Sequence, residues 1–164
     1  MHRTCRGQRR ILARSAVEAT SFTCDLPWAC VSIATPGSRW PTLSDVHRVG
    51  LLQIAFDDKQ SLAWGSLREH FQERHAHAIL DFAQRYWPVI ELLLVHCEAG
   101  TSRSPAVAAA LSQVFLGHEG EFLLPHLYQP NHLVLHTLLD VACQRGLLAS
   151  EEGPRDRSER GWDR

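Results

Sequence analysis

A cysteine and an arginine lie close together in the stretch HCEAGTSRS, which begins at His96. Cys97 comes next, Arg103 follows six positions later, and Ser104 ends the stretch. The residues between are mostly small and include Gly100, so the backbone can turn successive N–H groups inward around an anion. A thiolate is a strong nucleophile, and a guanidinium matches two oxygens of a phosphoryl group. The spacing therefore predicts phosphoryl chemistry at Cys97.

The flanking sequence indicates which elements position this stretch. The apolar run VIELLLVH (89–96) is typical of a central strand that is buried on both faces. Pro105 is favoured at the first position of a helix, and Gly117 is well placed to end that helix. The loop would then lie at a helix N-terminus, where free N–H groups and the helix dipole stabilise anions and favour the thiolate form of Cys97.

The remaining periodicity predicts one α/β domain with a central, mostly parallel sheet flanked by helices. The expected strands are 11–13, 29–34, 50–58 and 89–96, and the expected helices are 66–86, 105–116 and 131–145, with Ser66 and Asn131 as N-caps. The third strand ends in the two aspartates of the segment FDD, directly before a long helix.

The stretch resembles the active-site signature HCxxGxxR, followed by Ser or Thr, of the cysteine-dependent protein tyrosine phosphatases. The matching residues are His96, Cys97, Gly100, Arg103 and Ser104. The wider segment VHCEAGTSRSPAVAAA is similar to the compact, bacterial branch near the dual-specificity phosphatases, as are the SIATPG turn, the strand ending in FDD and the PN before the last helix. The resemblance implies a protein-tyrosine-phosphatase (dual-specificity-like) fold over roughly residues 10–146.

The resemblance also implies roles for these residues. Cys97 would attack phosphorus and form a phosphocysteine, Ser104 would ease departure of the thiolate, and His96 would orient the loop. The implied phosphate-binding residues are Glu98, Ala99, Gly100, Thr101, Ser102 and Arg103. An aspartate would protonate the leaving oxygen and then activate water. Asp58 is favoured as this acid and Asp57 is the alternative, and the mechanism requires no metal and no cofactor.

The expected activity is hydrolysis of a phosphomonoester by a protein tyrosine or dual-specificity phosphatase, on a phosphorylated protein or a small phosphomonoester. Phosphotyrosine is the first choice, and phosphoserine or phosphothreonine would suit a shallower pocket. Glu98 and the absence of lysine from the loop disfavour multiply phosphorylated inositides. The alternatives are a catalytically inactive pseudophosphatase module that binds phosphate, and an arsenate reductase or rhodanese with a similar cysteine loop.

Composition limits the partners. The net charge of −1 gives no global attraction to nucleic acid or to an anionic membrane. The five cysteines are odd in number and irregularly spaced, which favours a reducing, cytoplasmic setting over a disulfide framework. No CxxC pair supports a zinc site, and no apolar stretch approaches the ~18 residues that would indicate a membrane span. The histidines His70, His75 and His77 are expected at the surface or partly buried, not as metal ligands.

The expected phosphatase domain spans residues 1–149. Within it, residues 1–9 are interpreted as a basic lead into the first strand, with a transit peptide as the alternative. Residues 150–164 are charged and nearly free of apolar side chains, which predicts a disordered tail. Cys24, Cys30 and Cys143 are interpreted as core residues, although a protective disulfide with oxidised Cys97 is the other reading.

Overall fold

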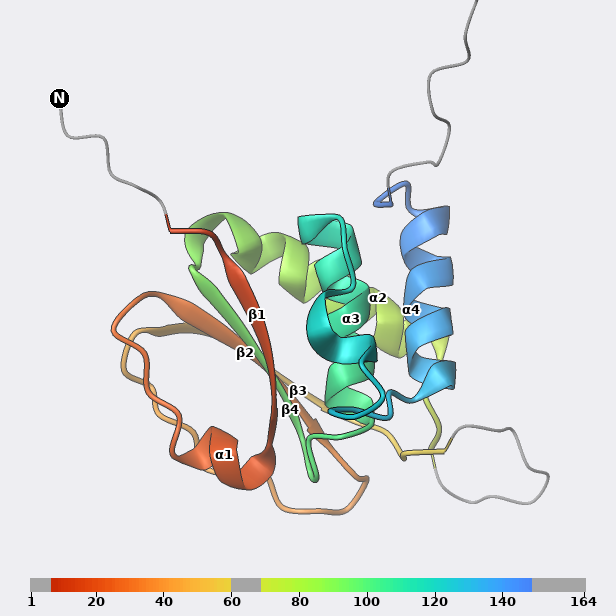
Figure 1. Cartoon of the computed structure of the whole chain (residues 1–164). Coiled ribbons are helices and arrows are strands. Elements are labelled where there is room, and N and C mark those ends of the chain that lie inside the picture. Colours follow the sequence, from red (N-terminus) through yellow and green to blue (C-terminus); the bar gives the residue numbers. More distant parts are fainter. Residues whose placement is uncertain (1–6, 60–68, 149–164) are drawn as a thin grey trace, which may run out of the picture.

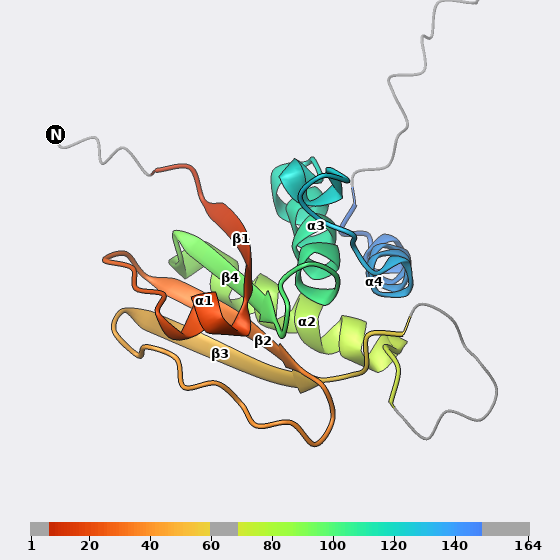
Figure 2. The ribbon, with the colours of Figure 1, turned by 60° about the horizontal axis from the view of Figure 1, so that its bottom comes forward.

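A four-stranded parallel sheet with the strand order β1-β4-β2-β3 forms the centre of the molecule (Figure 2). The computed structural model describes residues 7–59 and 69–148. The strands are β1 (Arg10–Ser15), β2 (Trp28–Ala34), β3 (Arg48–Ala55) and β4 (Leu92–Cys97). Because β4 lies between β1 and β2, it is fully buried, as its leucine- and valine-rich sequence requires. The expected α/β class with a parallel sheet is confirmed.

The longer helices cover one face of this sheet, and a short helix covers the other (Figures 1 and 2). The helices are α1 (Ala16–Thr20), α2 (Glu73–Tyr86), α3 (Arg103–Leu116) and α4 (His132–Gln144), with single turns η1 (Trp87–Val89) and η2 (Gly120–Leu123). Val95 and Cys97 of β4 belong to the main core with α2, α3 and α4, whereas Leu94 belongs to the smaller cluster beside α1. Since side chains alternate along a strand, His96 and Cys97 face opposite sides of the sheet.

The second helix begins later than the sequence predicts. Ser66, the expected N-cap, lies outside the described residues, but residues 69–72 are not helical and α2 begins at Glu73. Phe71 is buried and packs edge-to-face on Phe56, with ring centroids 4.7 Å apart, and Gln72 after it has an extended backbone. The N–H of Gln72 then donates to Nδ1 of His75 at 2.9 Å, which holds the first turn. Tertiary packing of Phe71 therefore overrides its helical spacing.

Other boundaries shift by less. Helix α3 begins at Arg103, so Pro105 occupies its third position, where a backbone N–H is not needed either. Gly117 ends that helix in the left-handed conformation, with φ +78°, and Asn131 caps α4 through Val134 N–H, as expected. Strand β4 begins at Leu92 and not at the expected residue 89, because Val89 is the last residue of the turn η1.

The chain also contains a helix that the sequence analysis missed. Ser15 and Glu18 form a capping box at the start of α1: the Ser15 hydroxyl accepts the Glu18 N–H and the Glu18 carboxylate accepts the Ser15 N–H. The proposed domain boundary at 149 and the tail of 150–164 lie at and beyond the end of the described residues. No helix among the described residues is long and apolar enough to cross a membrane.

Candidate active site

The stretch HCEAGTSRS connects β4 to α3 at the edge of the sheet where the parallel strands end (Figure 1). Ligands of open parallel sheets bind at this edge. Gly100 approaches the end of β1 so closely that a Cβ there would lie 2.5 Å from the backbone nitrogen of Ser15, and its φ is +76°. Only glycine fits this close approach and this backbone conformation. The loop is thus packed against β1 as well as joined to β4.

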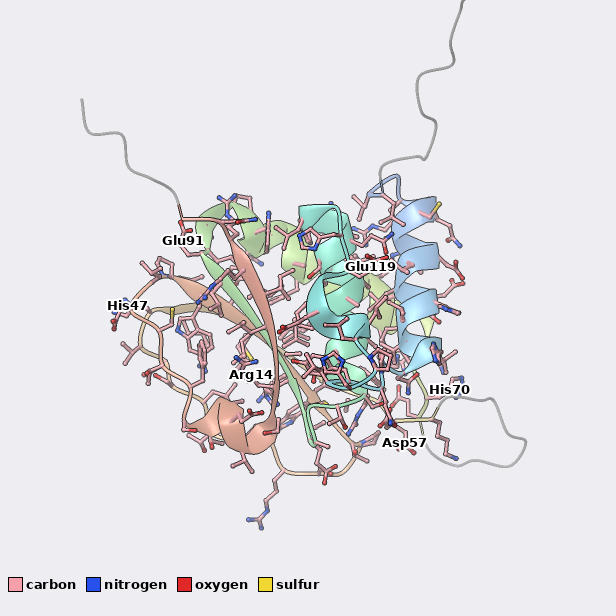
Figure 3. The ribbon with its side chains drawn as sticks, in the orientation of Figure 1. Arg14, His47, Asp57, His70, Glu91 and Glu119 are labelled. Carbon is pink, nitrogen blue, oxygen red and sulfur yellow. The ribbon has the colours of Figure 1, made fainter. Side chains whose placement is uncertain are left out.

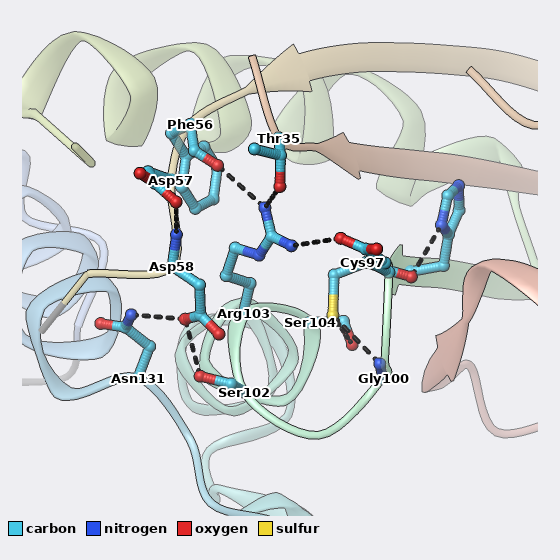
Figure 4. A network of polar contacts seen from close by, with 12 residues as sticks. Thr35, Phe56, Asp57, Asp58, Cys97, Gly100, Ser102, Arg103, Ser104 and Asn131 are labelled. Atoms are coloured by element: carbon cyan, nitrogen blue, oxygen red, sulfur yellow. Dashed lines mark hydrogen bonds and ion pairs between the residues drawn. The ribbon is translucent and has the colours of Figure 1, made fainter. Parts of the chain in front are cut away.

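Cys97 lies at the bottom of the loop, 2% exposed. The Gly100 N–H donates to Cys97 Sγ at 3.2 Å, and Sγ lies 3.2 Å from Ser104 Oγ (Figure 4). The Ser104 hydroxyl in turn donates to the Arg14 carbonyl oxygen at 3.3 Å. When the thiol ionises, the same hydroxyl can rotate and donate to sulfur. Two donors, one backbone and one side chain, can therefore stabilise a thiolate.

Arg103 is almost fully buried, and other segments hold one end of its guanidinium. Its Nη1 donates to Thr35 Oγ1 at 3.1 Å and to the Phe56 carbonyl oxygen at 2.9 Å (Figure 4). Its Nη2 lies 3.8 Å from the Glu98 carboxylate, and its buried Nε has no hydrogen-bond partner within the described part of the chain. The Nε–Nη2 edge therefore remains available to two oxygens of an oxyanion.

The two candidate acids differ in exposure and in contacts. Asp58 is exposed, and its Oδ1 accepts the Ser102 hydroxyl at 2.8 Å and the Asn131 amide at 2.7 Å. Asp57 is 8% exposed; its Oδ1 accepts the Asp58 N–H at 3.0 Å, and its own N–H donates to the Glu69 carbonyl oxygen at 2.6 Å. Figure 3 shows Asp57 close to the N-terminal end of α4, the end that Asn131 caps. Asp58 is thus held by Ser102 of the stretch HCEAGTSRS, and Asp57 supports the acid loop, which is the segment of Asp57 and Asp58 after β3.

His96 is fully buried, and its Nδ1 lies 3.4 Å from the Cys97 carbonyl oxygen. Burial lowers the pKa of His96, against a smaller opposing effect of this contact with Cys97. The ring is therefore neutral near pH 7, with its proton on Nδ1, where it can donate to the carbonyl. A neutral ring on the opposite face of β4 from Cys97 can hold the loop, but it cannot exchange protons with a substrate.

Most of the residues singled out from the sequence meet in a pocket of about 420 Å³. The pocket is lined by Thr35, Asp57, Asp58, Cys97, Glu98, Ala99, Ser102 and Arg103. Gly100 contributes its N–H to Cys97, whereas Thr101 is exposed and its carbonyl accepts the Gln129 N–H at 2.9 Å, away from the pocket lining. Among the described residues, no group of three His, Cys, Asp or Glu side chains could hold a metal ion.

Sequence reasoning missed three contributors to this pocket. Thr35 and the Phe56 carbonyl orient Arg103, and Asn131 holds Asp58 in addition to capping α4. The TPG turn after β2 and the PN before α4 marked the segments of Thr35 and Asn131 but not these contacts. The contacts depend on the order of the strands in the sheet, which the local sequence does not specify.

No protein-family model and no curated protein matches this chain. Solved structures do match it. Human tyrosine phosphatase-like serine/threonine/tyrosine-interacting protein matches with a TM-score of 0.60 and 14% identity, over 82% of this chain and 92% of that one. Human DUSP28 has a TM-score of 0.55 and 16% identity over 83% and 94% of the two chains. A mouse putative dual specificity phosphatase has a TM-score of 0.52 and 19% identity, over 82% and 79%.

These likenesses define the class of fold. The chain has the fold of the tyrosine and dual-specificity phosphatases, and the expected protein-tyrosine-phosphatase-like architecture is confirmed. At these identities the comparison establishes the fold alone. What the pocket does must be argued from its own residues.

Proposed function

We propose that the chain hydrolyses phosphomonoesters through a phosphocysteine on Cys97, as a protein tyrosine or dual-specificity phosphatase. The observation that carries this proposal is one pocket that contains a buried thiol in contact with the Gly100 N–H and the Ser104 hydroxyl, an arginine whose Nε has no hydrogen-bond partner within the described residues, and an exposed carboxylate. A nucleophile, an oxyanion site and an acid are what phosphoryl transfer requires.

In the first step the Cys97 thiolate attacks phosphorus opposite the leaving oxygen. The Nε–Nη2 edge of Arg103 and the N–H groups at the start of α3 hold the equatorial oxygens while their charge redistributes. The P–O bond to the leaving group breaks, and Asp58 gives its proton to that oxygen. Because the Asp58 contacts described above fall on Oδ1, Oδ2 is the atom that carries this proton.

In the second step a water molecule attacks the phosphocysteine. The Asp58 carboxylate takes a proton from the water, and the P–S bond breaks to release inorganic phosphate. The electron pair of that bond returns to sulfur, where the Gly100 N–H and the Ser104 hydroxyl stabilise the thiolate. Asp58 is protonated again, so the cycle closes without a metal or a cofactor.

The residues that line the pocket favour a phosphorylated protein as substrate, with phosphotyrosine as the first choice. Within the lining, Arg103 is the one basic residue, and Glu98, Asp57 and Asp58 are acidic. A substrate with several phosphates would meet like charge at this rim, so a single phosphate on a neutral aromatic group is favoured. Because the nucleophile must remain reduced, the proposal retains a cytoplasmic setting.

The test is hydrolysis of p-nitrophenyl phosphate across pH with a chelator present, for wild type, Cys97→Ser, Asp58→Asn and Asp57→Asn. We expect Cys97→Ser to show no turnover. Asp58→Asn should lose about a hundredfold in kcat together with the basic limb of the pH profile. Asp57→Asn should keep that limb, because Asp57 supports the loop and does not supply the proton.

The other outcomes separate the alternatives. If wild type binds vanadate without turning over any phosphate ester, the chain is a phosphate-binding pseudophosphatase module and the catalytic proposal fails. If Asp57→Asn, and not Asp58→Asn, loses the basic limb, Asp57 is the acid. Reduction of arsenate, or sulfur transfer to cyanide, without phosphatase activity would identify an arsenate reductase or a rhodanese.

A further inference from the structure

A second, smaller pocket of about 140 Å³ lies beside the proposed active site. It shares Thr35 and Glu98 with the catalytic pocket, so these two side chains form the wall between the pockets. His96 lines the second pocket and Cys97 lines the first. His96 and Cys97 face opposite sides of β4, so the two pockets meet at the carboxyl edge of the sheet, and the second pocket extends toward Ala16 at the start of α1.

The side chain of His96 supplies a hydrogen-bond acceptor without a partner. The ring is fully buried, its Nδ1 faces the Cys97 carbonyl oxygen, and its Nε2 has no hydrogen-bond partner among residues 7–59 and 69–148. With the proton on Nδ1, Nε2 can only accept a hydrogen bond. A buried acceptor that lacks a donor is unfavourable, so this atom favours a ligand with an N–H or an O–H group.

A second polar atom without a partner belongs to the residue aligned with His96 on the neighbouring strand. Ser32 of β2 is aligned with His96 of β4, and since the strands are parallel, the two side chains leave the sheet on the same face. The Ser32 Oγ is buried and, like His96 Nε2, has no partner within the described residues. Two such atoms together indicate that this region accommodates a polar group or a water molecule.

The charged residues at the rim of the pocket restrict which kind of ligand group can bind there. Arg39 lines the pocket, is exposed, and makes no hydrogen bond or ion pair with the rest of the described chain, so its guanidinium can donate to a ligand. The Glu98 carboxylate on the shared wall can accept from a ligand. A carboxylate ligand would be repelled by Glu98 and would offer no donor to His96. An ammonium would be repelled by Arg39, and an aliphatic group would leave Nε2 unpaired.

We propose that the second pocket binds a side chain next to the phosphorylated residue of the substrate, and that it selects a neutral group with both donor and acceptor atoms. Asparagine, glutamine, serine and threonine have such groups. The carboxamide or hydroxyl donates to His96 Nε2 and accepts from Arg39. This inference rests on the proposed function, because it places the phosphate of the same peptide at Cys97. The shared wall of Thr35 and Glu98 keeps the two pockets within reach of adjacent residues of an extended peptide.

The experiment uses short phosphotyrosine peptides with asparagine, aspartate or leucine on either side of the phosphotyrosine and alanine elsewhere. These side chains have nearly the same shape and differ in charge and hydrogen bonding. We measure kcat/KM from phosphate release for wild type, Arg39→Met and Ala16→Leu, where Ala16 lines the second pocket and leucine would fill it. Arg85→Met, on the surface of α2, is the matched control.

We expect wild type and Arg85→Met to prefer the asparagine peptide over both others by about fivefold to tenfold at one of the two positions, mainly through KM. Arg39→Met and Ala16→Leu should lose this preference while p-nitrophenyl phosphate, which has no neighbouring side chain, is hydrolysed as before. Equal kcat/KM for the three peptides, or a preference that survives Ala16→Leu, would overturn the inference and indicate that the pocket holds water only.

A failure of the proposed function gives a different result. If no substrate is turned over, the affinities of the same peptides for wild type and Ala16→Leu are measured by calorimetry. A preference for asparagine that Ala16→Leu abolishes would support the second pocket even though catalysis fails. Equal affinities would reject the pocket as well.

Discussion

The guanidinium of Arg103 has two edges with different functions. Nη1 is held by the Thr35 hydroxyl and the Phe56 carbonyl, and the Nε–Nη2 edge remains for the oxyanion. The held end fixes the direction of the free edge before a substrate arrives. Such preorganisation lets a donor act without reorientation during the reaction.

Substitution of Thr35 tests this division. Thr35→Val keeps the shape of the side chain but removes the oxygen that accepts from Arg103 Nη1, while the Phe56 carbonyl still accepts. We expect kcat/KM for p-nitrophenyl phosphate to fall about tenfold, with little change in the thermal midpoint because Thr35 is only partly buried. Thr35→Ser restores the oxygen and should restore most of the activity. Equal rates for the valine and serine variants would show that Thr35 does not position Arg103.

The sequence could identify the nucleophile and the arginine because their chemistry is contained in one continuous loop. It could not identify Thr35, which lies 68 positions from Arg103 and reaches it only because β2 pairs with β4. The same holds for Asn131, where the helix-capping signal was visible but the contact with Asp58, 73 positions away, was not. Contacts between the ends of different strands require the strand order.

At the scale of elements, one side chain at the start of α4 both caps the helix and contacts the acid loop. The Asn131 Oδ1 accepts the Val134 N–H at 3.2 Å, and its Nδ2 donates to Asp58 Oδ1 and to the Lys59 carbonyl oxygen. One amide therefore caps the start of the helix and holds the candidate acid beside the loop that carries Ser102. Because both functions use different atoms of the same side chain, a substitution can separate them.

Asn131→Ser is the separating variant. Serine still caps α4 but has no amide to donate to Asp58, so stability should change by less than about 1 kcal/mol. Activity should depend on the leaving group, since protonation matters most for poor leaving groups. We expect kcat for phenyl phosphate to fall about tenfold and kcat for p-nitrophenyl phosphate to fall much less. A uniform loss for both esters would mean that Asn131 supports the fold of the pocket and does not position the acid.

The start of α2 depends on a histidine that is held neutral. His75 is buried against Phe56 and Phe71, its Nδ1 accepts the Gln72 N–H, and its Nε2 lies 3.3 Å from the Glu69 carboxylate. Burial, with smaller effects of nearby Arg74 and His70, lowers the pKa of His75 from 6.5 to about 4. Protonation of Nδ1 would also break the hydrogen bond from Gln72.

Between pH 6.5 and 4 the unfolded chain therefore binds a proton at His75 that the folded chain does not. The free energy of unfolding is therefore not reduced by His75 above pH 6.5. It falls as the pH is lowered toward 4, by at most about 3 kcal/mol. We expect His75→Asn, whose Oδ1 can still accept from Gln72, to lose stability less steeply than wild type over this range in urea unfolding. The lowered pKa of His96 adds the same sign of slope to both proteins, so parallel curves would reject the role of His75.

At the scale of the molecule, the parallel sheet brings the ends of β2, β3 and β4 to one edge, and each end contributes a part of the pocket. The sequence predicted the strands from apolar runs followed by polar turns, α3 from Pro105 and Gly117, and α4 from its apolar face and its cap at Asn131. It placed the start of α2 too early, because the burial of Phe71 against Phe56 is a tertiary contact. The helix α1 could have been predicted, because Ser15 and Glu18 have the spacing of a capping box.

We expect residues 1–149 to be sufficient for catalysis. All residues that line the two pockets lie between positions 16 and 103, and the helix that holds Asp58 ends at Gln144. We expect a chain shortened after residue 149 to keep kcat/KM for p-nitrophenyl phosphate within about twofold and its thermal midpoint within about 2 °C, because a charged terminal segment adds little to a core. A larger loss of stability would mean that residues 150–164 pack on the domain. A loss of activity at unchanged stability would mean that they act at the site itself.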